Sequence, residues 1–453
     1  MLEPQHSFGV RYELPVPLGI FVGGGAAVVV LSFLLLVVRP RQPAPEATDL
    51  DDAVPIRSAA RLRGSASVAV LAFLCWCGLV GSQEIPENLL PTAFWIVIWV
   101  AAPLSCGLVG DWTPTVNPFA HLARLADRPR LRSVLLGDDE RVRWPSGLGW
   151  WPAAALFTFG ILCELVYNET STVPQTIASG LIAYAALSVL MGLLFGDEWL
   201  RRGELFTVLF DTWGRLGYFR FGAPGRRGFA GGLDRPFSHH PSRVAFVLLV
   251  LLNVSYDGLL STPQWSHLVA DLPSGWTRTN GDLELVKTGG LFAAGAVLTL
   301  CFAAFARASE AVAGRTTRAT TALAGLMPTL VPIAFAYLLA HYTEYLLVNG
   351  QLIIPLIGNP VGRGWWPVHL PSPFNDDYRI HIHLLPSAFY WYTALVAIVA
   401  AHVGAVVLSH RHLRRVTRSA ASAARAELPW LAIMVGYTCL SLWLLAQPLT
   451  KER

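Results

Sequence analysis

Apolar residues fill ten segments of this chain, and polar residues gather in the stretches between them. Each segment is about 17 to 27 residues long. A helix of roughly 20 apolar residues crosses the hydrocarbon core of a membrane. The segments lie near 17–38, 66–82, 91–110, 151–167, 175–196, 243–260, 283–306, 322–348, 386–409 and 428–446. The pattern predicts an all-α, polytopic bundle of about ten transmembrane helices.

The composition agrees with this class, since 53% of the residues are hydrophobic and only 14% are charged. Soluble domains carry roughly 25% charged residues. Arginine is abundant and lysine is confined to Lys287 and Lys451, which is typical of a GC-rich bacterial genome and indicates a bacterial plasma membrane. All six cysteines lie in apolar segments, without a disulfide framework or a paired zinc motif.

Cationic residues alternate between loops, and this fixes the expected orientation. Five loops (39–65, 111–150, 197–242, 307–321 and 410–427) together hold 26 arginines, whereas the other loops and both tails hold six arginines and lysines. Loops rich in Arg and Lys stay in the cytoplasm. Both termini are therefore expected outside it. The net charge of +4 reflects this topology and contact with the lipid bilayer, not nucleic-acid binding.

The stretches between the segments suggest one transmembrane domain, 1–453, with three notable connections. The Pro- and charge-rich stretch 39–65 is expected to be a cytoplasmic linker. The cytoplasmic loop 197–242 contains ELFTVLFDTWGRLGYF, which is typical of an interfacial helix. The external loop 349–385 is rich in Pro, Gly and Trp and is expected to cover the outer surface as a lid.

Three predicted helices carry ionisable side chains near their outer ends: Glu164 in CELVYNET, Asp257 in NVSYDG, and His341 with Glu344 in AHYTEYLL. In each, polar residues recur at i, i+3 and i+4, on one helical face. Ionisable groups inside a membrane are costly and mark functional sites. We expect an outward-open polar cavity, in which Glu164 or Asp257 acts as general base or orients a metal-ligating imidazole. The alternative is that these residues lie at the interface beside belt tyrosines.

A metal site is a further hypothesis for this outer side. His381 and His383 lie two positions apart in the external loop, and extended chain would place both imidazoles on one side. With His341 and Glu344 they would form a set suited to a divalent ion such as zinc. A haem is not indicated, because the predicted depths of His341 and His402 differ too much for both to ligate one iron. Nucleotide-binding motifs are also lacking.

Several strings resemble bacterial, largely actinobacterial, multi-pass membrane proteins described as fenitrothion hydrolases: CELVYNET, NVSYDGLLSTPQWS, AHYTEYLLVNGQLIIP, AHVGAVVLSHRHL and MVGYTCLSLWLLAQPL. The resemblance covers most of the chain, from LPVPL near its start to the last helix. It implies hydrolysis of an organophosphate triester but assigns no catalytic residues. A metal that activates water would suit this chemistry, with a small apolar substrate entering from the outer leaflet.

Two other functions compete with the hydrolase. A ten-helix transporter of a small solute or ion would use Glu164, Asp257 and Glu344 to handle protons or a cation, with Pro328 and Pro332 breaking the eighth helix. A structural or assembly subunit of a membrane complex would use buried polar groups to join helices. A transporter needs polar groups that continue to the inner side. The predicted inner halves are nearly free of acids, which favours the hydrolase. Oligomeric state is not encoded in these patterns.

Overall fold

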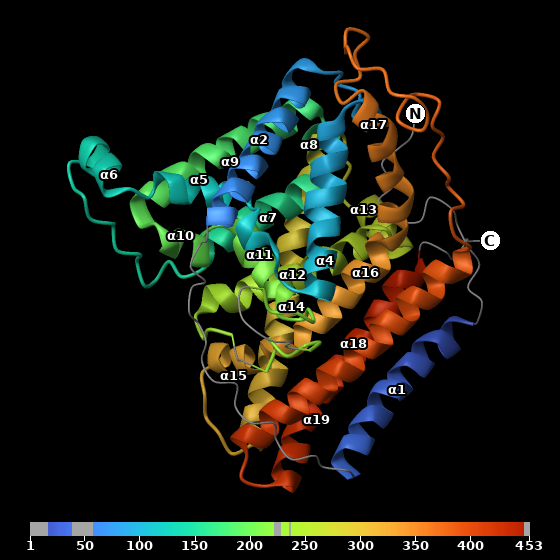
Figure 1. Ribbon diagram of the computed structural model, residues 1–453. Helices are drawn as coiled ribbons and strands as arrows, with labels where there is room; N and C mark the ends of the chain where they lie inside the picture. The colour runs from blue at the N-terminus through green and yellow to red at the C-terminus, as the bar shows by residue number, and fades with distance from the viewer. Residues whose placement is uncertain (1–16, 39–57, 222–227, 235–236, 448–453) are drawn as a thin grey trace. The chain divides into compact units, whose positions relative to one another are not determined.

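The computed structural model describes residues 17–38, 58–221, 228–234 and 237–447, and within them the chain forms helices and no strands (Figure 1). Nine helices in these ranges are long and apolar enough to cross a membrane. They correspond to nine of the ten predicted segments. The chain is thus an all-α, polytopic membrane protein embedded in a lipid bilayer. Which side of the membrane holds the termini stays a prediction.

The remaining predicted segment, 151–167, forms a shorter helix, α7 (Trp151–Leu165). Its 15 residues span roughly 22 Å at 1.5 Å per residue, less than a hydrocarbon core of roughly 30 Å. The helix breaks at Val166 and Tyr167, and a single turn, α8 (Asn168–Ser171), follows. The hydroxyl of Ser171 donates to the carbonyl of Cys163 (2.5 Å) and holds this turn against the end of α7.

The helices group into two compact units. Unit 1 comprises Met1–Leu50, Ala230–Thr343 and Leu385–Arg453, and unit 2 comprises Asp51–Phe229 and Glu344–Leu384. The prediction of a single transmembrane domain, 1–453, stays a prediction. Each unit is discontinuous in sequence, because the chain passes from unit 1 to unit 2 within helix α16 (Leu330–Asn349).

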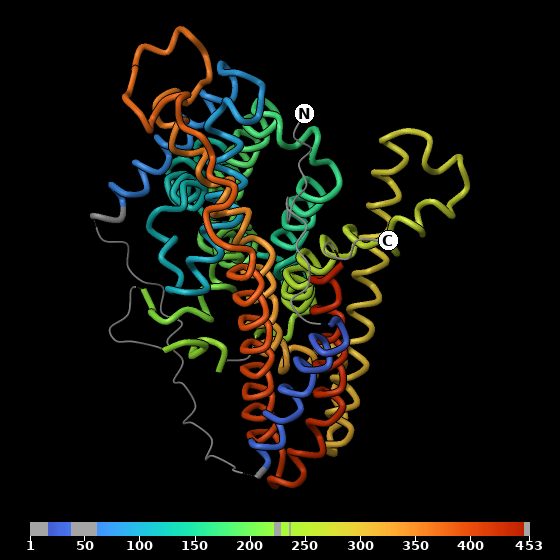
Figure 2. The backbone as a smooth tube through the Cα atoms, turned by 90° about the vertical axis from the view of Figure 1, so that its right-hand side faces the viewer, coloured from blue at the N-terminus to red at the C-terminus, as the bar shows by residue number. Residues whose placement is uncertain are grey.

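Unit 1 is built around its last helix, which contacts four others. Besides the first part of α16 it contains α1 (Leu18–Val38), α12 (Pro241–Leu260), α13 (Pro263–Ala270), α14 (Asn280–Val312), α15 (Ala319–Leu326), α18 (Ser387–Val416) and α19 (Ala420–Ala446). Helix α19 contacts α1, α12, α14 and α18, and α1, α18 and α19 run side by side in Figure 2. The ring of Phe302 packs on Trp430 and Tyr437 of α19. Apolar side chains thus fill most of the space between these helices.

Helix α19 begins eight residues before the predicted apolar segment. Ser419 caps it by accepting a hydrogen bond from the backbone N–H of Ser422, and the helix continues through Pro429. The predicted cytoplasmic loop 410–427 therefore includes the first turns of this helix. Because the helix starts early, Glu427 lies inside the bundle and not in a connection.

Unit 2 contains shorter elements. They are α2 (Ser58–Val80), α3 (Leu89–Pro91), η2 (Thr92–Ala101), α4 (Ala102–Val109), α5 (Pro118–Ala126), α6 (Pro129–Leu136), α7, α8, α9 (Pro174–Phe195), α10 (Asp197–Arg202), α11 (Leu205–Gly214) and α17 (Ile353–Gly358). Helix α9 contacts α2 and α5. Gly192 of α9 allows this approach to α5, because a Cβ there would lie 2.4 Å from the carbonyl oxygen of Ala123.

The three connecting segments described in the sequence analysis differ in how closely the structure matches their prediction. Residues 39–57 of the expected linker lie outside the described residues, and from Ser58 onward the chain is already helical. The loop 197–242 does contain a helix at the expected place, α11, but most of its side chains are buried against α4 and α7 of unit 2. The external loop 349–385 begins with helical turns that include α17 and continues as irregular chain.

Candidate functional site

Two of the predicted site residues form a buried pair in unit 1. Asp257, near the end of α12, and His341, in the second half of α16, are 6% and 8% exposed. The Nε2 atom of His341 and the Oδ2 atom of Asp257 form an ion pair. Both helices are long enough to cross a membrane, so this carboxylate and imidazole share a site that excludes most water. Removing one partner would leave the other buried without its counter-group.

A second polar layer lies beside this pair, around Tyr437 of α19. The hydroxyl of Tyr437 hydrogen-bonds with that of Ser255, two residues before Asp257 on α12. The ring of Tyr337, one helical turn before His341 on α16, lies 6.5 Å from the ring of Tyr437. A hydroxyl both donates and accepts hydrogen bonds, so this layer is able to hydrogen-bond to groups on either side of it.

His402 of α18 belongs to the same layer, with its ring 6.5 Å from that of Tyr437. It is fully buried, and its Nδ1 lies 2.8 Å from the carbonyl oxygen of Ile398. A carbonyl only accepts, so Nδ1 carries the proton and Nε2 is left as an acceptor. That Nε2 atom has no hydrogen-bond partner among the described residues. Within the described residues, the imidazole thus keeps one unused acceptor atom, Nε2, inside unit 1.

A third layer lies further along α18 and α19 and centres on Glu427. Its side chain is fully buried. The hydroxyl of Ser409 donates to Oε1 (2.7 Å), and Nδ1 of His410 lies 2.8 Å from Oε2. The second nitrogen of His410, Nε2, has no hydrogen-bond partner in the described part of the chain. A second buried carboxylate–imidazole pair thus lies within the same unit.

The order of the three layers follows from how the helices run. Ser255 contacts Tyr437, and Gly258 lies against Leu444, so α12 and α19 are parallel. At 1.5 Å per residue, Asp257 lies roughly 3 Å beyond Ser255, whereas Glu427 lies roughly 15 Å from Tyr437 in the opposite direction. The layers therefore extend over roughly 18 Å of unit 1, more than half of a hydrocarbon core of roughly 30 Å.

The other predicted catalytic residue, Glu164, belongs to unit 2. It is buried at the end of α7, and its Oε2 accepts a hydrogen bond from Nε1 of Trp99 (2.9 Å). Trp99 lies in η2, a π-helical stretch of the kind that often occurs at functional sites. The Glu164 carboxylate also lies close enough to Tyr345, near the end of α16, for its charge to act on that hydroxyl. The predicted cavity shared by Glu164, Asp257, His341 and Glu344 draws on both units and stays a prediction.

The predicted metal ligands take different positions. Glu344 follows His341 by three residues on α16 and is buried in unit 2, where its Oε2 has no hydrogen-bond partner among the described residues. His381 and His383 are exposed in the external loop. The backbone N–H and carbonyl of His381 both bond to the side chain of Gln351. Within the described ranges, no three His, Cys, Asp or Glu side chains lie together so as to hold a metal ion. The metal stays a prediction.

Sequence reasoning did not single out the layers around Tyr437 and Glu427. His402 was weighed only as a haem ligand, and His410 was not among the predicted site residues. The strings AHVGAVVLSHRHL and MVGYTCLSLWLLAQPL contain His402, His410 and Tyr437. Histidines eight residues apart on one apolar helix were the signal available. A comparison with protein-family models, curated proteins and solved structures found no match to this chain.

Proposed function

We propose that this protein translocates protons across a bacterial plasma membrane and that unit 1 contains the pathway. The observation that supports the proposal is the series of three buried polar layers, with a carboxylate–imidazole pair at each end. Ionisable groups inside membrane proteins are rare, and chains of acids and histidines are typical of proton pathways. Polar groups thus continue well beyond the Asp257–His341 end of the bundle, as a transporter requires and an outward-facing hydrolase does not.

The chemistry of each layer suits this role. Histidine is the side chain whose ordinary pKa lies within the physiological range, so a histidine beside a carboxylate exchanges its proton readily. His341 and His410 would take up or release protons at the two ends. His402 would receive a proton at Nε2 and release it from the same atom, because Nδ1 donates to the backbone carbonyl of Ile398. Water molecules would bridge the longer interval between His402 and His410, because two imidazoles roughly 12 Å apart along a helix do not touch.

The central test removes both nitrogens of His402 while keeping an aromatic ring, through His402→Phe. Purified protein would be reconstituted into liposomes loaded with a pH-sensitive dye, and a potassium diffusion potential would be applied with valinomycin. We expect the proton flux to fall at least about tenfold, because the middle layer loses its only imidazole. The matched control is Tyr256→Phe on α12, which loses only the bond from its hydroxyl to the carbonyl of Lys287.

Two results would contradict the proposal. One is a wild-type flux no greater than that of empty liposomes at any applied potential. The other is a His402→Phe flux equal to that of Tyr256→Phe, with equal amounts of protein inserted. Insertion would be measured by gel densitometry after flotation, so a variant that fails to fold is not mistaken for one that fails to conduct.

Hydrolysis is the second candidate, and the Asp257–His341 pair favours it. A carboxylate that orients an imidazole produces a general base, the arrangement used to activate water or a nucleophile. The resemblance to fenitrothion hydrolases points to an organophosphate triester as substrate. Under this proposal His341→Ala abolishes hydrolysis of fenitrothion by purified protein, while Tyr256→Phe retains it. Metal analysis of the same samples tests whether His341, Glu344 and the loop histidines hold a divalent ion.

A further inference from the structure

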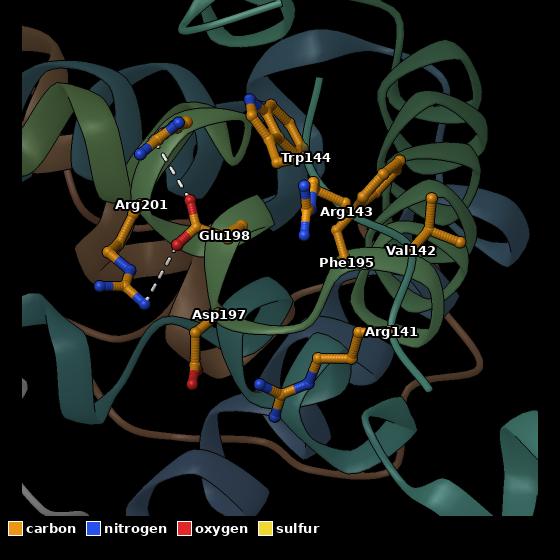
Figure 3. A pocket seen from close by; sticks show the side chains of 9 residues that line it. Arg141, Val142, Arg143, Trp144, Phe195, Asp197, Glu198 and Arg201 are labelled. Carbon is orange, nitrogen blue, oxygen red and sulfur yellow. Dashed lines mark ion pairs between the residues drawn. The ribbon is translucent and has the colours of Figure 1, made fainter. Parts of the chain in front are cut away.

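Unit 2 contains a cationic pocket where one of its membrane-spanning helices ends. The cavity measures about 470 Å³ and is lined by two short segments, 141–144 and 195–202, that meet at the end of α9 (Figure 3). The lining residues are Arg141, Val142, Arg143, Trp144, Phe195, Asp197, Glu198, Arg201 and Arg202. The span Pro174–Phe195 stops at this cavity, so the pocket lies at the level where the apolar helix gives way to charged residues.

The walls of the pocket are held in place by contacts that do not involve the arginine side chains. The backbone N–H of Val142 donates to the carbonyl of Leu194 (2.9 Å), which ties the segment 141–144 to the end of α9. The rings of Trp144 and Phe195 meet edge to face at 5.0 Å. Gly196, at φ 58, makes the turn into α10, and a Cβ there would lie 2.6 Å from Nε of Arg141. The cavity is therefore part of the packed structure.

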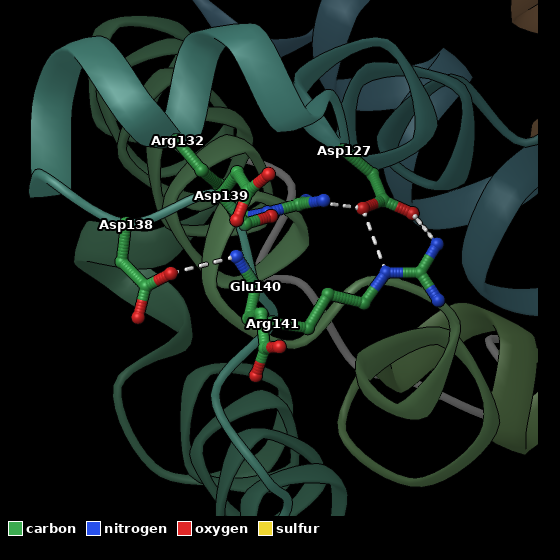
Figure 4. A network of polar contacts seen from close by, with 6 residues as sticks. All are labelled: Asp127, Arg132, Asp138, Asp139, Glu140 and Arg141. Carbon is green, nitrogen blue, oxygen red and sulfur yellow. Dashed lines mark hydrogen bonds and ion pairs between the residues drawn. The ribbon is translucent and has the colours of Figure 1, made fainter.

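Arg141 also belongs to a network of polar contacts with Asp127 and Arg132 (Figure 4). Its Nε and Nη2 atoms donate to the two oxygens of Asp127 at 2.9 and 2.6 Å. Arg132 donates to the same carboxylate at 2.6 Å and also to the carbonyl of Asp139. Bonding to Asp127 raises the pKa of Arg141, and Asp197 adds to this effect. One carboxylate, Asp127, thus fixes the positions of two arginines.

The charges inside the pocket are also unbalanced. Four arginines against two carboxylates leave a net charge of +2 on the lining. Arg201 and Arg202 share the single carboxylate of Glu198, at 3.3 and 3.2 Å. Arg143 is exposed beside Trp144 and makes no hydrogen bond or ion pair within the described residues. Arg143 is thus the guanidinium group of this pocket that is most available to an anion, since the other three are paired with carboxylates.

We propose that this pocket binds a phosphate group, carried by an anionic phospholipid or by a soluble phosphate. Guanidinium groups match phosphate oxygens in pairs, and arginine is the residue most used for this recognition. Val142, Trp144 and Phe195 provide an apolar wall beside the cationic one. A lipid headgroup with its glycerol carbons would contact both walls, and aromatic residues are common at this level of a membrane. The proposal is independent of proton translocation, which concerns unit 1.

The test measures equilibrium binding by the full-length protein after lipid removal in detergent. Four probes are titrated: dioctanoyl phosphatidylglycerol, dioctanoyl phosphatidylcholine, glycerol phosphate and inorganic phosphate. We expect phosphatidylglycerol to bind and phosphatidylcholine to bind at least about tenfold more weakly. Arg143→Gln should weaken phosphatidylglycerol binding about tenfold, because it removes a charged hydrogen-bond donor. Arg143→Lys keeps the positive charge but loses the paired N–H donors of the guanidinium group. Its affinity for phosphatidylglycerol should lie between those of Arg143→Gln and the wild type.

The matched control is Arg130→Gln on α6, which makes the same charge change at an exposed residue outside the pocket. Binding by this variant should equal that of the wild type. Inorganic phosphate or glycerol phosphate binding as tightly as the lipid would identify the soluble source. The proposal is overturned if none of the three anions binds, if phosphatidylcholine binds equally, or if Arg143→Gln and Arg130→Gln behave alike. Thermal unfolding of each variant in the same detergent confirms that it is folded.

Discussion

Both units bury carboxylates within or beside their helices, but they surround them with different chemistry. In unit 1, Asp257 pairs with His341 and Glu427 with His410. In unit 2, Glu164 accepts from the indole of Trp99. The partners of Glu204, which is fully buried before α11, are Tyr184, Asn117, Thr207 and the backbone N–H of Phe206. The residue type is the same, and the partners decide what each carboxylate is able to do.

The difference lies in whether the partner itself exchanges a proton near neutral pH. Imidazole does so, whereas indole, amide and hydroxyl groups keep their protons. A carboxylate held by such groups satisfies the hydrogen-bonding needs of several chain segments, as Glu204 does for α9, α11 and the residue before α5. We infer that the acids of unit 1 serve proton transfer and that Glu204 serves the structure of unit 2.

The largest expected effect comes from neutralising the carboxylates of unit 1. Asp257→Asn and Glu427→Gln each keep the shape of the side chain but remove the acid that stabilises a protonated histidine. Under the proton-translocation proposal, each should lower the flux into liposomes at least about tenfold. Glu204→Gln in unit 2 should leave the flux per inserted protein unchanged. Equal losses in all three variants would remove the functional distinction between the two units.

Local sequence patterns do not predict most of the difference between the buried carboxylates of the two units. Nine of the ten predicted segments form helices of membrane-spanning length, because hydrophobicity along a helix is a local property. Asp257 and His341 were both singled out, but as a base and a metal ligand, because their pairing depends on the contact between α12 and α16. Glu427 was missed since Arg425 and Pro429 beside it resemble a helix boundary. The partners of Glu204 come from residues up to 87 positions away, which no local pattern reports.

An intermediate effect is expected on the stability of unit 2. Glu204→Ala leaves the side-chain donors of Asn117 and Tyr184 buried without their acceptor, and each unsatisfied buried group costs about 1–3 kcal/mol. We expect a loss of about 3 kcal/mol in the free energy of unfolding, and a smaller loss for Glu204→Gln, which keeps one acceptor oxygen. Unfolding in mixed micelles would measure both. The control is Glu140→Gln at an exposed position, which should change the free energy by less than about 0.5 kcal/mol. A Glu204→Ala variant as stable as this control would contradict the structural role.

The smallest effect concerns the pH dependence of a histidine in unit 2, His121 of α5. Its Nε2 lies 3.3 Å from the hydroxyl of Ser65, and its ring packs against Gly64. No carboxylate pairs with it among the described residues, in contrast to His341 and His410. Burial, with a contribution from the positive charge of Arg124, lowers the pKa of His121. The unfolded chain, where the pKa is ordinary at about 6.5, therefore binds a proton more readily than the folded protein.

It follows that the neutral His121 ring stabilises the fold at pH values above the pKa that this histidine has in the unfolded chain. This stabilisation declines as the pH falls below about 6.5 toward the lowered folded-state pKa. Replacing the ring through His121→Gln removes that dependence. Between pH 7 and pH 5, the free energy of unfolding of the wild type should fall more than that of the variant, as measured by thermal unfolding at each pH. The two decreases should differ by under about 1 kcal/mol. His369→Gln, at an exposed histidine in the external loop, should keep the wild-type slope. If His121→Gln kept that slope as well, the acid sensitivity of the fold would have to come from other groups, and the histidine–carboxylate pairs of unit 1 would be the first to examine.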